Sequence, residues 1–120
     1  MTITIVVPCY NEQEVLPWSI AQLLSLTDRL RHDTGNEARL MFVDDGSTDS
    51  TWDIIAQAAA KHDGISGLKL AHNVGHQNAL WAGIEQTYQE CDATVSIDAD
   101  LQDDPLAIID MARHVAEGAD

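Results

Sequence analysis

The sequence predicts an α/β fold, with a mostly parallel sheet and helices on both faces. Strand-like and helix-like segments alternate four times along the chain. The strand-like segments are continuously apolar, as expected for strands buried on both faces, and no hairpin signal joins two of them. A parallel pair of strands needs a long crossover connection, which the helix-like segments supply. With 120 residues, 45% of them hydrophobic, the chain suits one domain over residues 1–120.

The first strand and helix are expected before residue 32. Residues 1–7, MTITIVV, are apolar and β-branched, and Pro8 ends the run. Asn11 and Glu14 have the spacing of a capping box, which predicts a helix start there. The helix is expected to reach about residue 31, followed by a loop over 32–38. Its apolar stripe consists of Val15, Ile20, Leu23, Leu24 and Leu26.

The remaining elements follow the same alternation. A strand is expected within 39–47, where RLMFV ends abruptly in DDGS, and others are expected over 67–72 and 93–97. Helices are expected over 47–62, within 73–90, and from Asp104-Pro105 to about residue 117. The tryptophans fall on helical stripes and are expected in the core; they are Trp18, Trp52 and Trp81.

Charge and composition exclude several classes of function. The formal net charge is −14, so nucleic acid is not an expected partner and anionic lipid headgroups would be repelled. Cys9 and Cys91 lack the spacing of a zinc or redox site and are expected to be reduced thiols. No signal peptide and no apolar run of about 20 residues is present. We therefore expect this segment to be soluble and cytoplasmic.

Polar clusters follow each expected strand, at the point where ligands bind in open parallel sheets. They are Tyr10-Asn11-Glu12, Asp44-Asp45, the loop 72–78 with Gly75, and residues 98–104. Because the carboxyl ends of parallel strands share one edge, these clusters should lie together. That placement predicts a binding site.

Asp98 and Asp100 are candidate ligands for a divalent cation. If the strand continued through them, both side chains would point to one side, and Gln102 would extend the row. Carboxylate and amide oxygens suit Mg²⁺ or Mn²⁺, and magnesium prefers few protein ligands together with substrate phosphates. A solvated acidic turn explains the same pattern. Asp103 and Asp104 are assigned to the start of the next helix.

The other polar residues have two interpretations each. Asp44 and Asp45 suit a turn, but a carboxylate there could also accept a hydrogen bond from a base or a ribose. Tyr10 could lie against a base or be a boundary aromatic residue. The loop histidines, His72 and His76, could contact a ligand or simply lie at the surface.

Four stretches resemble, in order and spacing, the inverting family-two glycosyltransferases. They are IVVPCYNE (5–12), FVDDGSTDST (42–51), NVGHQNALWAG (73–83) and SIDADLQDDP (96–105). The last two are most similar to the branch that makes polyprenyl-phosphate sugars, which includes dolichyl-phosphate mannose synthase-like and bactoprenol glucosyltransferase-like enzymes. The resemblance covers essentially the whole chain.

The resemblance implies a Rossmann-like half of a GT-A nucleotide-diphospho-sugar transferase fold. It implies transfer of a sugar, with inversion, from a UDP- or GDP-sugar to an acceptor such as a polyprenyl phosphate. Mg²⁺ or Mn²⁺ would bridge the diphosphate, held by Asp98, Asp100 and Gln102. The implied donor-binding residues are Pro8, Tyr10, Asn11, Glu12, Asp44, Asp45, Gly75, Asp98, Ala99 and Asp100.

Family members continue beyond the metal motif with an acceptor-binding half, which the resemblance therefore places beyond residue 120. Any catalytic base would lie there too, and a full-length protein would associate with the cytoplasmic face of a membrane. Residues 1–120 alone are expected to bind nucleotide weakly, if at all, and not to turn over a donor sugar. An exposed sheet edge would favour a homo-oligomer.

A receiver-like phosphoacceptor domain that binds Mg²⁺ is the alternative function. Its length and βα repeats agree with the sequence, but the acidic pair follows the second strand rather than the first. A dehalogenase-type phosphatase fits less well, because its Asp-x-Asp belongs near the first strand.

Overall fold

The computed structural model describes residues 2–87, 92–97 and 99. In chain order, the elements are β1 (Thr2–Cys9), α1 (Leu16–Thr34), β2 (Glu37–Asp44), α2 (Thr51–Lys61), β3 (Ile65–Lys69), α3 (His76–Thr87) and β4 (Ala93–Ser96). The expected last helix lies outside these residues. No helix of the described part is long and apolar enough to cross a membrane.

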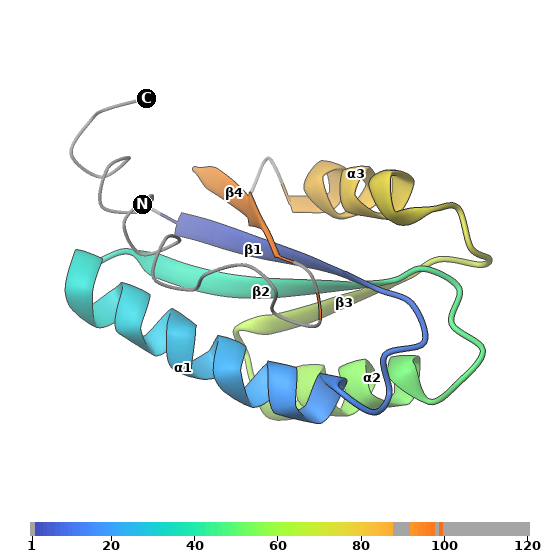
Figure 1. Ribbon diagram of the computed structural model, residues 1–120. Coiled ribbons are helices and arrows are strands. Elements are labelled where there is room, and N and C mark those ends of the chain that lie inside the picture. Colours follow the sequence, from blue (N-terminus) through green and yellow to red (C-terminus); the bar gives the residue numbers. More distant parts are fainter. Residues whose placement is uncertain (1, 88–91, 98, 100–120) are drawn as a thin grey trace.

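The four strands form one parallel sheet in the order β3-β2-β1-β4. Helices α1 and α2 cover one face and α3 covers the other, as Figure 1 shows. The predicted α/β class, the parallel sheet and the two covered faces are therefore confirmed. A receiver fold places β1 between β2 and β3, whereas here β1 lies between β2 and β4. The strand order contradicts the receiver-like alternative.

Side chains of the central strands pack into two separate apolar clusters, one on each face of the sheet. Ile3, Ile5 and Val7 of β1 pack with the buried sides of α1 and α2. Val6 points the other way, into a smaller cluster with Val43 and Ala79 of α3. Successive side chains of a strand point to opposite faces, so a continuously apolar strand serves both layers.

The first helix begins later than the capping-box pattern predicted. Asn11 has φ +52°, in the left-handed region, and α1 starts at Leu16 without a side-chain cap. Pro17 lies in the first turn, where its missing N–H costs nothing. The helix also continues to Thr34, three residues beyond the expected end, and stops at Gly35 with φ +71°. The predicted cap at Asn11 was wrong.

Two of the three tryptophans are not core residues. Trp18 is 53% exposed and Trp81 is 60% exposed, while Trp52 is half-buried against the core. Each exposed ring lies two positions after a buried residue, Leu16 or Ala79. Two helical positions correspond to a rotation of about 200°, which turns the side chain away from the sheet.

Candidate functional site

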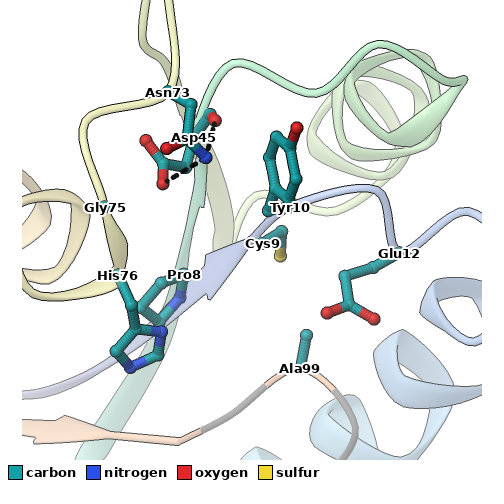
Figure 2. Close-up of a pocket in the computed structure, with 9 residues that line it drawn as sticks. All are labelled: Pro8, Cys9, Tyr10, Glu12, Asp45, Asn73, Gly75, His76 and Ala99. Carbon is teal, nitrogen blue, oxygen red and sulfur yellow. Dashed lines mark hydrogen bonds between the residues drawn. The ribbon is translucent and has the colours of Figure 1, made fainter.

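The strand order creates a crevice between the ends of β1 and β4. Helix α1 leaves β1 on one face of the sheet, whereas α3 approaches β4 on the other, so the connections diverge at this point. Ligands of open α/β sheets bind at such switch points. A cavity of about 560 Å³ lies there, drawn in Figure 2. The described residues that line it are Pro8, Cys9, Tyr10, Glu12, Asp45, Asn73, Gly75, His76 and Ala99.

Asp45 is fixed in the wall of this cavity by the loop after β3. Its Oδ1 accepts a hydrogen bond from the Val74 N–H at 2.7 Å, and its Oδ2 accepts one from Asn73 Nδ2 at 3.1 Å. The residue is only 3% exposed. Each carboxylate oxygen can accept more than one hydrogen bond, so Asp45 retains capacity for a ligand donor.

Gly46 allows the loops after β2 and β3 to meet. Its φ is +70°, and a Cβ atom there would lie 2.4 Å from Asn73 N and 2.4 Å from the His72 carbonyl carbon. Only glycine tolerates both the conformation and the close approach. This contact brings Asn73 and Gly75 to the cavity that Asp45 lines.

The loops after β1 and β2 are joined by reciprocal hydrogen bonds. The Asn11 N–H donates to Ser47 Oγ at 2.9 Å, and Asn11 Oδ1 accepts from the Thr48 N–H at 2.8 Å. The Glu12 N–H donates to Thr51 Oγ1 at 2.9 Å. Asn11 therefore holds the two loops together and does not line the cavity.

A second reciprocal pair links Gln13 and Asp49. The Gln13 N–H donates to Asp49 Oδ2 at 3.3 Å, and Gln13 Oε1 accepts from the Ser50 N–H at 3.0 Å. Desolvation opposes ionisation of Asp49, but hydrogen bonds from the Thr51 hydroxyl and from backbone N–H groups outweigh it and lower its pKa. Asp49 therefore stays ionised in the loop that carries the site.

Asp44 pairs in register with Cys9, which lines the cavity, but Asp44 itself is not among the lining residues. Asp44 is fully buried and accepts a hydrogen bond from the Ser47 N–H at 3.1 Å, while its Oδ2 has no partner among the described residues. Burial raises the pKa of the Cys9 thiol far above its ordinary value, and the charges of Glu12 and Asp44 raise it further. Cys9 therefore keeps its proton near neutral pH and is a poor nucleophile.

The segment after β4 reaches the cavity at Ala99. Strand β4 ends at Ser96 and Ala99 lies in a turn, so the extended geometry assumed for the acidic motif does not reach Ala99. The candidate metal ligands Asp98, Asp100 and Gln102 lie outside the described residues. Within the described part, no group of three His, Cys, Asp or Glu side chains could hold a metal ion.

A bound cation nevertheless suits the chemistry of the cavity. Its described lining includes the carboxylates of Glu12 and Asp45 but neither lysine nor arginine. A ligand diphosphate would meet negative charge here unless a cation lay between them. Two carboxylates flank Ala99 in the sequence, and hard oxygen donors of this kind suit Mg²⁺ or Mn²⁺.

The structure brings together six of the candidate residues and separates two. The six that line the cavity are Pro8, Tyr10, Glu12, Asp45, Gly75 and Ala99. Asn11 and Asp44 support the loops from outside it. Sequence reasoning did not single out Asn73, although its place between a strand and a glycine was a usable signal. Of the two loop histidines, only His76 is among the described lining residues.

Comparison with known sequences gives one family and several relatives. The family model described as "Glycosyl transferase family 2" matches residues 4–120. The Bacillus subtilis protein called "Uncharacterized glycosyltransferase YkoT" is 44% identical over 98% of this chain and 36% of its own length. An undecaprenyl-phosphate 4-deoxy-4-formamido-L-arabinose transferase of Shewanella sediminis is 36% identical over 98% of this chain and 34% of its own length. The chain thus spans about a third of these relatives.

Solved structures share the fold. S. aureus TarS 1-349 in complex with UDP-GlcNAc superimposes with a TM-score of 0.73 at 22% identity, covering 98% of this chain and 32% of that one. The mannosyltransferase PcManGT from Pyrobaculum calidifontis, in complex with GDP-Man and Mn²⁺, gives a TM-score of 0.69 at 22% identity and the same coverage. The expected GT-A-type architecture is confirmed by these similarities.

Proposed function

The chain belongs to glycosyl transferase family 2, and on that premise we propose that it forms the donor-binding part of an inverting, metal-dependent glycosyltransferase. The donor is a nucleoside-diphosphate sugar and the acceptor is a polyprenyl phosphate. The observation that carries this proposal is the cavity at the β1–β4 switch point. It combines an exposed aromatic residue, a buried carboxylate and the segment that bears the acidic motif.

The base and ribose are assigned to the end of the cavity near Tyr10 and Asp45 (Figure 2). The Tyr10 side chain is 46% exposed, so its ring is accessible to a planar ligand. Asp45 is held by Val74 and Asn73 and can accept a hydrogen bond from a base N–H or a ribose hydroxyl. Asp44 does not line the cavity, so this role is not assigned to it.

The diphosphate is assigned to the region near Ala99, where the acidic motif passes. Asp98, Asp100 and Gln102 would hold Mg²⁺ or Mn²⁺, which would act as a Lewis acid on the departing nucleoside diphosphate. The absence of lysine and arginine from the described cavity lining supports this assignment. So does the structural neighbour PcManGT, whose complex contains both GDP-Man and Mn²⁺.

The acceptor is assigned from the names of relatives. Several transferases at 33–36% identity are named for undecaprenyl phosphate. A phosphate oxyanion is already a nucleophile, so its attack on the anomeric carbon needs no general base. A single in-line displacement inverts that carbon. We also propose that the protein lies at the cytoplasmic face of a membrane and that it self-associates.

Transfer to a lipid phosphate tests this function directly. The full chain, with any natural extension, is incubated with labelled UDP- or GDP-sugars, undecaprenyl phosphate and Mn²⁺. We expect a labelled lipid whose anomeric configuration, read by NMR, is opposite to that of the donor. Retention of configuration, or no lipid product with any donor, would contradict the proposal.

A further inference from the structure

One hydrogen bond connects α1 to the segment that carries the acidic motif. The Ser19 hydroxyl donates to the carbonyl oxygen of Ala99 at 2.5 Å, across 80 residues of sequence. Ser19 is 0% exposed and Ala99 is 3% exposed. A buried carbonyl needs a hydrogen-bond donor, and the Ser19 hydroxyl supplies it.

Three threonine hydroxyls on the described helices behave differently. Those of Thr27, Thr34 and Thr87 donate to carbonyls three or four residues earlier in their own helix. That local pattern is the usual one for serine and threonine inside helices. Ser19 instead donates to a residue outside its own helix, the turn residue Ala99, which lies 80 residues later in the sequence.

The Ser19 hydroxyl binds the segment after β4 at a point beyond its last described hydrogen bond to β1. The last hydrogen bond along β4 runs from the Ile97 N–H to the Val6 carbonyl at 3.1 Å. The side chains of Ile97 and Ala99 are both buried in the cluster that contains Ile20 of α1. Beyond Ile97, the Ser19 hydroxyl is the described polar contact that fixes the backbone at Ala99.

We propose that Ser19 is a positioning residue for the metal-binding segment, an inference that rests on the proposed function. The Ala99 carbonyl belongs to the same planar peptide unit as the Asp100 N–H. The Ser19 bond therefore restrains the peptide unit that joins Ala99 to the next residue. Without the bond, ordering that peptide unit would cost part of the metal-binding free energy.

Replacing Ser19 by alanine separates this role from general stability. UDP affinity of the full chain is measured by calorimetry with and without Mn²⁺. We expect Ser19→Ala to reduce the Mn²⁺-dependent gain in affinity about tenfold, the effect of one lost hydrogen bond. UDP affinity without Mn²⁺ should be unchanged. Ser19→Thr keeps the hydroxyl and should recover most of the gain.

Thr27→Val is the matched control, because it removes another buried hydroxyl of α1 whose bond stays within the helix. It should leave the Mn²⁺ gain intact. If Ser19→Ala does not fold, Ser19→Cys, with similar shape and a weaker donor, should show a smaller loss of the same kind.

Three results would overturn the inference. A normal Mn²⁺ gain in Ser19→Ala would do so, as would an equal loss in Thr27→Val. If the unmodified protein binds UDP with no Mn²⁺ gain at all, the metal-dependent function fails first, and the role of Ser19 fails with it. The first two results leave the proposed function standing.

Discussion

The carboxylate of Asp45 accepts a hydrogen bond from the Val74 N–H at 2.7 Å, which joins the loop after β2 to the loop after β3. The bond places a buried acceptor and a glycine-containing turn on the same wall of the cavity. The two adjacent aspartates at the end of β2 therefore have different roles. Asp44 organises its own turn through Ser47, and Asp45 organises the neighbouring loop.

Substitution of Asp45 by asparagine should weaken nucleotide binding whether or not metal is present. The amide replaces one acceptor oxygen by a donor, which would face either the Val74 N–H or Asn73 Nδ2. A hydrogen bond to a charged group contributes about 1.5–3 kcal/mol, so UDP affinity should fall roughly tenfold to a hundredfold. Calorimetric titration with UDP measures this change.

Asp53→Asn provides the charge-matched control for that experiment. Asp53 is exposed on α2, so the substitution changes the net charge equally without touching the cavity. Its UDP affinity should match that of the unmodified protein. Equal losses in the two variants would assign the effect to overall charge and remove Asp45 from the site.

Gly46→Ala should destabilise the protein far more than Gly35→Ala. Both glycines have φ near +70°, but a Cβ atom at Gly35 meets nothing within 4 Å, whereas at Gly46 it meets backbone atoms of the next loop. The conformational penalty alone is about 1–2 kcal/mol. The clash should bring the loss for Gly46→Ala to about 3 kcal/mol or more. Urea denaturation measures both values, and equal losses would contradict the close approach of the two loops.

The Cys9 thiol should resist alkylation in the folded protein. Burial is the main cause of its raised pKa, and the charges of Glu12 and Asp44 add to it. In a Cys91→Ser background, where Cys9 is the remaining cysteine, iodoacetamide at pH 8 should react only after unfolding. Rapid modification under native conditions would show that the thiol is ionised or accessible.

The same raised pKa predicts how stability changes with pH. The folded state keeps the proton above the ordinary thiol pKa of 9.0, where the unfolded state loses it. The contribution of Cys9 to stability is therefore fully present below pH 9.0 and declines as the pH rises further. Denaturation of Cys9→Ala should lack this part of the alkaline decline. A decline identical in the two proteins would contradict the shift.

The layers of the fold followed from the sequence because burial on both faces leaves a continuous apolar run. Ile3, Ile5 and Val6 are buried as expected. The start of α1 could not be predicted, because the side chain of Asn11 bonds to Thr48, a residue distant in sequence. Strand β3 begins at Ile65, two residues early, since its position is set by pairing with Leu40 of β2.

Part of the site was predictable because the carboxyl ends of parallel strands lie at the same edge of the sheet. That rule placed Tyr10, Asp45 and Gly75 together from the sequence alone, and all three line the cavity. It could not distinguish Asp44 from Asp45, because which of two adjacent side chains enters the cavity depends on the backbone turn at Gly46. Nor could it find the Ser19–Ala99 bond, which no local pattern encodes.

The dependence of UDP binding on Mn²⁺ tests the central claim most directly. The full chain and its Asp100→Ala variant are titrated with UDP by calorimetry, with Mn²⁺ and without it. The account predicts that Mn²⁺ strengthens binding to the unmodified protein and that Asp100→Ala abolishes this gain while sparing metal-free binding. Equal affinity with and without Mn²⁺, or a gain that survives in Asp100→Ala, would contradict it.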